Sequence, residues 1–577
     1  MLVAWTGFQG LTAKNALESA AADLAKVAAD LGAGDVEAAR GRLEDVQDSA
    51  ATARSNTRGP GWWLGSKLPG IGDDVSAVRT VADVTDVIAS DVMPDVVSVA
   101  QVLHPDRLAP RNGRFRLAPI RAATDDVLTV DEQLRRQSGR VQAIDRGALV
   151  PQLAGPVGDL ADQLGQASAM TERASYAVRL LPPMLGADGP RTHLLLFQNN
   201  AEIRATGGIP GSVAVLSARK GKLEIVDQGT ARDFGRYDAP PLRLTAEERT
   251  LYGDKLGIFG ADINFTPDFP RTGQLARTMW RTENGVAVDG VMSIDPVALS
   301  YLLEGTGPVE VPGGPALRAK TAVEVLLQDV YLQVPDTDAQ DAYFAAAAEA
   351  VFDAVASGQG DSARMLRGLT RAVSEGRINL WSARKAEQSL IAETALSGRV
   401  PREEGDRPFV GVFMNDGTAS KLQYYFRHRV DVEPVSCNPE GRQTLEVTVT
   451  VRSTAPKNAA ELPPSVIGPR TEGAYFGVEP GDQRVNVHLY APIGGWIESS
   501  AVDGEETPLS EAEHLGHPVG SRSVTLTPGQ ERTLTYRIRG ALDQTGDPRL
   551  RVTPGVHGDG VGRVSISACT LASDPSA

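Results

Sequence analysis

The spacing of apolar residues divides the chain into three parts, and the first of them is helical. Between residues 11 and 185, apolar side chains recur at the spacing of amphipathic helices. Gly32-Ala33-Gly34 ends one helical stretch, and Asp35 is a good N-cap for the next. We expect residues 1–185 to form a helical stalk or bundle without a chemical motif. The predicted helices cover 13–31, 35–55, 75–103, 118–137 and 155–181, with a loop over 58–74.

In the second part, residues 186–398, short apolar strands alternate with helices. The strands are predicted at 193–197, 212–217 and 223–226, and a turn at Lys220-Gly221 joins the last two. The helices are predicted at 270–282, 295–304, 319–332, 338–356, 361–374 and 382–396. This mixture indicates a layered α/β domain.

The third part, residues 405–577, has the alternating pattern of β-strands throughout. Leu445–Val451 alternates strictly between apolar and polar residues, as does 522–527, and turn residues separate such runs. We therefore predict an antiparallel β-sandwich, which makes the whole chain a multidomain α+β protein. Cys437 and Cys569 flank most of this part. They either form one disulfide that staples the domain or remain two buried thiols.

Charge and composition exclude several classes of protein. The net charge of −15 argues against a nucleic-acid-binding protein, because such proteins need a basic face. With 41% apolar residues the chain is too hydrophobic to be disordered. Two cysteines without a CxxC string cannot build a four-cysteine zinc site. Met1–Phe8 is apolar, and it is either the end of a signal anchor or an ordinary hydrophobic terminus.

Candidate chemistry begins where the first strand of the middle part ends. We expect a loop there that presents backbone N–H groups and an arginine fork to an anion. A structural turn with a local Glu202–Arg204 pair explains the same residues. The candidate ligand-binding residues in this loop are Asn199, Asn200, Glu202, Arg204, Gly207 and Gly208.

A second candidate, Arg232-Asp233, follows the third strand. Arg232 could reach into a cleft as a catalytic or binding group while Asp233 holds the arginine or a metal, although a salt-bridged loop is the simpler alternative. The string Ser382–Lys385 resembles an acylating serine motif, but Ser382 is more simply the N-cap of a helix. No Lys-Thr-Gly string accompanies it, which excludes a penicillin-binding protein.

Three long strings resemble a family of cell-envelope proteins of high-GC Gram-positive bacteria, known as domain of unknown function 4012. They are FQNNAEIRATGGIPGS, QGTARDF and DGVMSIDPVALSYLLEGTGPVEV. The resemblance extends over nearly the whole chain, including Trp62-Trp63, Asn415-Asp416-Gly417 and the cysteine-flanked sandwich. It implies a single-pass signal anchor, the extracytoplasmic face of the plasma membrane and a disulfide-permissive compartment.

More distantly, the middle part resembles LytR-CpsA-Psr domains, which transfer glycopolymers from polyprenyl-pyrophosphate carriers to peptidoglycan. The resemblance implies a hydrophobic tunnel for the lipid, with arginines and a magnesium ion at the pyrophosphate. The matching positions are Leu194–Arg204, Arg232-Asp233, Ile263-Asn264 and Asp295–Val311. Three segments depart from that family. In one of them, Pro210-Gly211-Ser212 replaces its Arg-Ser-Asp. Gln198-Asn199-Asn200 replaces its Gly-x-Asp, and Leu326–Asp329 lacks its paired arginines.

The sequence therefore predicts a membrane-anchored envelope protein that binds a polyprenyl-phosphate or glycan-phosphate ligand. Arg204 and Arg232 would grip the anion, and Asp233 would orient Arg232. One alternative is an active glycopolymer transferase acting on a cell-wall polymer, which requires magnesium near Asp233, Asp262 and Asp268. Another is a non-catalytic scaffold.

Overall fold

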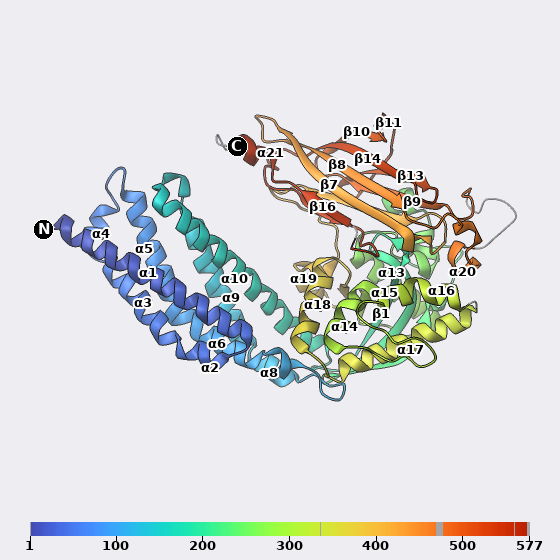
Figure 1. Cartoon of the computed structure of the whole chain (residues 1–577), viewed down its shortest axis with the longest axis horizontal. Helices are drawn as coiled ribbons and strands as arrows, with labels where there is room; N and C mark the ends of the chain where they lie inside the picture. Colours follow the sequence, from blue (N-terminus) through green and yellow to red (C-terminus); the bar gives the residue numbers. More distant parts are fainter. Residues whose placement is uncertain (1, 335, 469–476, 559, 574–577) are drawn as a thin grey trace. The chain divides into compact units, whose positions relative to one another are not determined.

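A computed structural model describes residues 2–334, 336–468, 477–558 and 560–573. The chain forms two compact units, residues 1–109 with 115–189 and residues 110–114 with 190–577 (Figure 1). The helical unit corresponds to the predicted stalk. The second unit holds both the predicted middle part and the C-terminal strands, so the boundary predicted between residues 398 and 405 falls inside one compact body.

The helical unit confirms the predicted α-helical region. Asp35 caps α2 by accepting a hydrogen bond from the Ala38 N–H at 3.0 Å. The predicted loop over 58–74 contains a short helix, α4, because Pro60 occupies its first turn, where no N–H donor is needed. α1 packs along α3, and α9 along α10 (Figure 1). The helices are α1 (Leu2–Ala33), α2 (Val36–Gly41), α3 (Leu43–Asn56), α4 (Pro60–Gly65), α5 (Gly72–Val87), α6 (Met93–Val102), α7 (Pro105–Leu108), α8 (Leu117–Ala122), α9 (Thr124–Gln142) and α10 (Pro151–Met184).

The signal-anchor prediction rests on Met1–Phe8, whose side chains lie outside the described residues. Within the part of the chain that the structure describes, no helix combines the length and the apolar character needed to cross a bilayer.

The second unit begins with a five-stranded sheet of order β3-β2-β1-β4-β5. β1 and β4 are parallel, and the other neighbours are antiparallel. Its strands are β1 (Arg191–Arg204), β2 (Gly207–Arg219), β3 (Lys222–Thr230), β4 (Gly290–Ile294) and β5 (Asn379–Ser382). β1 runs to Arg204, so the predicted anion-binding loop is instead the end of a long hairpin. Ser382 ends β5 and donates to Glu387, while the next helix starts at Lys385, which corrects the predicted N-cap.

Helices cover both faces of this sheet. On one face, Leu194, Leu196 and Val291 pack against Leu275 and Met279 of α13 in a dense core. Elsewhere on the sheet, α14 contacts β1, and α17 contacts β2 and β3. The helices of this part are α11 (Ala246–Tyr252), α12 (Lys255–Ile258), α13 (Phe269–Asn284), α14 (Pro296–Thr306), α15 (Ala322–Glu324), α16 (Val330–Gln333), α17 (Thr337–Ala356), α18 (Ser362–Ser374) and α19 (Lys385–Ala392).

Two further sheets share one apolar core. Their orders are β11-β10-β14-β8-β7-β16 and β12-β13-β9-β6-β15. The alternation predicted for Leu445–Val451 is confirmed, since Leu445, Val447, Val449 and Val451 are buried. The all-antiparallel prediction is wrong at two sheet edges, where β15 pairs with β6 and β16 with β7 in parallel. The elements are β6 (Phe409–Asp416), β7 (Phe426–Cys437), β8 (Gln443–Ser453), α20 (Pro464–Ile467), β9 (Gln483–Tyr490), β10 (Trp496–Val502), β11 (Glu505–Glu506), β12 (Ser510–His514), β13 (His517–Leu526), β14 (Glu531–Arg539), β15 (Arg549–Val552), β16 (Gly560–Val564) and α21 (Ala568–Ser573).

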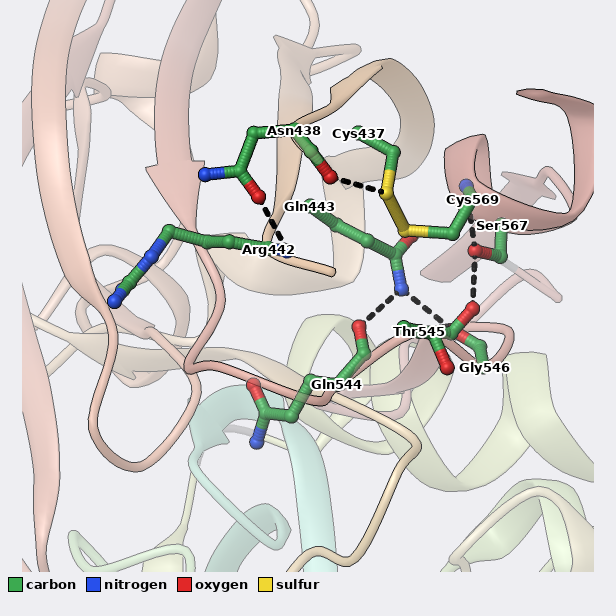
Figure 2. The surroundings of a disulfide bond; sticks show 9 residues. All are labelled: Cys437, Asn438, Arg442, Gln443, Gln544, Thr545, Gly546, Ser567 and Cys569. Carbon is green, nitrogen blue, oxygen red and sulfur yellow. Dashed lines mark hydrogen bonds between the residues drawn. A yellow bond between two sulfur atoms is a disulfide. The ribbon is translucent and has the colours of Figure 1, made fainter. Parts of the chain in front are cut away.

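The predicted disulfide is confirmed: Cys437 at the end of β7 is bonded to Cys569 in α21 (Figure 2). Nearby, the Gln443 side-chain amide donates to the carbonyl oxygens of Gln544 and Gly546 at 2.6 and 2.8 Å. The Ser567 hydroxyl accepts the Cys569 N–H at 3.0 Å. The C-terminal helix is thus held to the sheet by one covalent link, and polar contacts surround that link.

Candidate functional site

The second unit contains a cavity of about 420 Å³ between the five-stranded sheet and the helices that cover one of its faces. Its floor comes from alternate residues of the strands, and its roof comes from α14, α17 and the segment between α15 and α16. Most of this wall is apolar. The apolar lining residues are Leu195, Phe197, Ile209, Ile225, Ile294, Leu299, Leu302, Leu326, Leu327, Phe344, Ala347, Ala348, Val351, Phe352 and Val355.

The cavity has one polar end. β1, β3 and β4 run in one direction, and Arg232 and Asp295 line this end just beyond β3 and β4. Asn199 joins them from β1, shortly after the pairing of β1 with β4 stops at Phe197. The first residues of α14 and α17, Pro296 and Thr337, also line it. Helix N-termini carry a partial positive charge, and strand carboxyl ends are the usual place for ligands in such sheets.

A buried ion pair lies at this polar end. Lys421 comes from the segment after β6, and its Nζ lies 2.6 Å from Oε1 of Glu202 on β1. The same ammonium lies 4.8 Å from the ring centre of Tyr331, whose hydroxyl accepts a hydrogen bond from Asn199 Nδ2 at 2.6 Å. Burial alone would lower the pKa of Lys421, but Glu202 outweighs this effect and raises it. Burial likewise opposes ionisation of Glu202, yet Lys421 and Arg204 lower its pKa, so both groups are charged.

Arg232 also lines the cavity, but at its solvent side. Its side chain is 73% exposed, and the nearest carboxylate is Asp341 of α17, at 3.9 Å. Burial raises the pKa of Asp341, and Arg232 partly offsets this. The Asp233 carboxylate, expected to orient Arg232, instead accepts hydrogen bonds from the N–H and the hydroxyl of Thr230. With Thr230 it forms a capping box.

Arg204, the other predicted anion contact, lies inside the protein. Its guanidinium is 3.3 Å from Asp262 and 4.0 Å from Asp416, and it stacks on the Phe265 ring. Only 5% of its side chain is exposed, and it is not among the residues that line the cavity. Its contacts with Asp416 of β6 join β1 to the C-terminal sheets. The anion-binding role of Arg204 stays a prediction, and its contacts favour a structural one.

The remaining predicted residues of the hairpin shape β1. Asn200 is buried and donates to Asp295 at 3.0 Å, and Asp295 also pairs with Arg377 at 2.8 Å. A Cβ on Gly208 would lie 2.1 Å from the backbone carbon of Asn199, so only glycine fits where β2 crosses the irregular part of β1. Gly207 has a φ of +136°, which also favours glycine.

The three carboxylates proposed for a metal lie in different surroundings. Asp233 belongs to the capping box, Asp262 pairs with Arg204, and Asp268 accepts the Val400 N–H at 3.0 Å. Among the described residues, no three His, Cys, Asp or Glu side chains are grouped so that they could hold a metal ion.

Sequence reasoning missed Lys421, Tyr331 and Asp341. Lys421 lies 219 positions from Glu202, and no local pattern connects them. The one available signal is that Lys421 follows the Asn415-Asp416-Gly417 string closely. The apolar wall was also missed, because its residues have the same alternation as an ordinary core.

This arrangement defines a mixed α+β unit with a lipophilic cavity and a charged opening. Residues 188–331 match the model of a family described as a protein of unknown function (DUF4012). The match begins just before β1 and ends at Tyr331, and it confirms the predicted family resemblance over this segment. No curated protein and no solved structure matches the chain.

Proposed function

We propose that the second unit binds a lipid with an acidic headgroup, a polyprenyl phosphate or a polyprenyl-linked glycan phosphate. The observation that supports this most directly is the cavity itself, apolar along its length and charged at one end. Protein interiors are normally close-packed, so a large apolar hollow is typical of a ligand site. A chain of isoprene units matches such a wall, because it has no polar group that would need a partner there.

The charged end suits a phosphate. The N-termini of α14 and α17 supply partial positive charge, although Asp295 and Asp336 already cap part of their N–H groups. Arg232 is exposed and has only a distant partner, so its guanidinium is free to turn toward an anion. Asn199 and Tyr331 add hydrogen-bonding groups at the same place.

The LytR-CpsA-Psr-like fold and the extracytoplasmic envelope location are further parts of this proposal. The disulfide supports an oxidising compartment, since such bonds are rare in the cytosol. The membrane anchor, the cell-wall polymer as partner and a transferase activity stay hypotheses. The apolar cavity supports the lipid-binding part of the proposal most directly, so lipid binding is the function that we put forward.

The first experiment is mass spectrometry of an organic extract of the purified protein. A co-purifying polyprenyl phosphate would establish the ligand class. An extract free of lipids from folded, disulfide-intact protein would favour the scaffold instead.

The second experiment tests Arg232 with two ligands, a polyprenyl phosphate and the corresponding polyprenyl alcohol. Arg232→Ala should weaken phosphate binding by about tenfold to a hundredfold, because a charge-assisted contact is lost. Binding of the alcohol should not change. Arg219→Ala, which removes an exposed arginine from the far end of β2, is the matched control. Equal phosphate affinity for Arg232→Ala and wild type would exclude the assigned role.

A further inference from the structure

The helical unit exposes a group of large apolar side chains at one end. They belong to the segment 57–71 between α3 and α5, which we call the tryptophan loop. Trp63, Leu64, Leu68 and Ile71 keep 56, 54, 52 and 49% of their surface exposed. Single exposed apolar residues are common on protein surfaces, but four in nine consecutive positions form a patch of the kind that marks an interaction site.

The local structure explains why these side chains point outward. Gly59 and Pro60 start α4, and Trp62 on its first turn is half-buried close to Gly10 of α1. With Trp62 turned toward α1, its neighbours Trp63 and Leu64 face solvent. The connection before α10 reaches the same end of the unit, because the Val150 N–H donates to Asp74 at 3.0 Å. Val150 is a further exposed apolar residue, at 42%.

The tryptophan loop itself contains Arg58 and Lys67 and no acidic residue, and Asp73 and Asp74 follow it directly in the first turn of α5. Arg58 pairs with Asp83 at 3.2 Å, while Lys67 is exposed beside Leu68. In the sequence, Met1–Ala13 contains no charged side chain.

We propose that the tryptophan loop seats this end of the helical unit on the surface of an anionic lipid bilayer. Tryptophan is favoured at the boundary between headgroups and acyl chains, where its ring is buried and its N–H stays hydrated. Leu64, Leu68 and Ile71 add apolar area to the buried face. Lys67 can extend its ammonium to anionic headgroups while its stem covers apolar surface. This surface is separate from the cavity, so the proposal goes beyond lipid binding by the second unit.

The test is flotation of the full chain with vesicles of phosphatidylglycerol and phosphatidylcholine. The triple variant Trp63→Ser, Leu64→Ser, Leu68→Ser should reduce partitioning by about tenfold or more, since three apolar side chains leave the interface. Lys67→Glu should reduce it by about fivefold, and only when phosphatidylglycerol is present. Met170→Ser, which changes a 67% exposed residue on α10, is the matched control and should float like wild type.

A second measurement locates the contact. Brominated lipids quench tryptophan fluorescence only at short range, so Trp63→Phe should keep most of the partitioning and lose a large part of the quenching. The proposal is overturned if the triple variant floats as well as wild type while circular dichroism shows it folded. It is equally overturned if the wild-type protein does not bind the vesicles and instead dimerises in solution through the same residues.

Discussion

Both faces of the five-stranded sheet carry apolar side chains, but one face is close-packed and the other borders a cavity. On one face of β1, Leu194 and Leu196 are fully buried under α13. On the other face, the neighbouring residues Leu195 and Phe197 line an open cavity beneath α14 and α17. Successive residues of one strand therefore alternate between a close-packed core and the wall of a cavity.

This contrast shows that apolar character by itself does not reveal what a residue packs against. A core residue is stabilised by its protein neighbours, whereas a cavity residue lacks some of those contacts until a ligand supplies them. The surroundings of the two faces differ as well. The hollow face ends at the charged Lys421–Glu202 pair, and the filled face continues into apolar core.

The largest expected effect is the loss of a core side chain on the filled face. Leu196→Ala should lower the free energy of unfolding by about 2–5 kcal/mol, because it leaves a void among close-packed residues. Leu195→Ala, one position away on the hollow face, should cost less than about 1 kcal/mol, since no close-packed neighbour is lost there. Urea denaturation of the two variants measures the difference directly. Similar losses for both would mean that the cavity is packed in solution.

A fall in pH should lower the stability of the protein, because the buried side chain of His428 is neutral in the folded state. His428 on β7 donates through Nε2 to the Thr553 carbonyl at 2.9 Å, its Nδ1 has no partner, and burial lowers its pKa to about 4. Because this pKa lies below the ordinary value of 6.5, the unfolded chain takes up a proton first as the pH falls. The stability that His428 contributes is complete above pH 6.5 and is lost toward pH 4, by up to about 3 kcal/mol.

Urea denaturation at pH 7 and pH 4 checks this expectation, with His428→Gln as the comparison. The variant should lose less stability over that range than wild type. Asp416 acts in the opposite direction, because burial raises its pKa to about 6 and its neutral form is favoured in acid. An equal acid-induced loss in wild type and His428→Gln would contradict the assignment of a neutral buried imidazole.

The smallest expected change in stability comes from filling the hollow. Ala348 of α17 lines the cavity, so Ala348→Phe should place a ring in the space that we propose for the lipid. Stability should change by less than about 1 kcal/mol, whereas the same enlargement in a filled core typically costs about 1–3 kcal/mol. Binding of the polyprenyl phosphate should be lost. Retained binding together with a large destabilisation would show that no such space exists.

Local pattern was sufficient for several elements. The helices of the stalk, the Asp35 cap and the alternation of Leu445–Val451 depend on residues close in sequence, and the structure confirms them. The hairpin end was mistaken for a loop because Asn199, Glu202 and Arg204 are polar. In the structure their side chains are buried or half-buried by distant partners, so polar composition did not indicate solvent exposure.

By itself the sequence determined the helical region, the alternating strand Leu445–Val451, the family match of residues 188–331 and a candidate arginine just beyond β3. Only the tertiary structure decided which face of β1 is filled, and that Arg204 is internal while Arg232 is exposed. It also brought Lys421 to Glu202 and formed the cavity. The physical reason is that hydrogen bonds and side-chain periodicity act over a few residues, whereas a cavity is bounded by elements that meet only after folding.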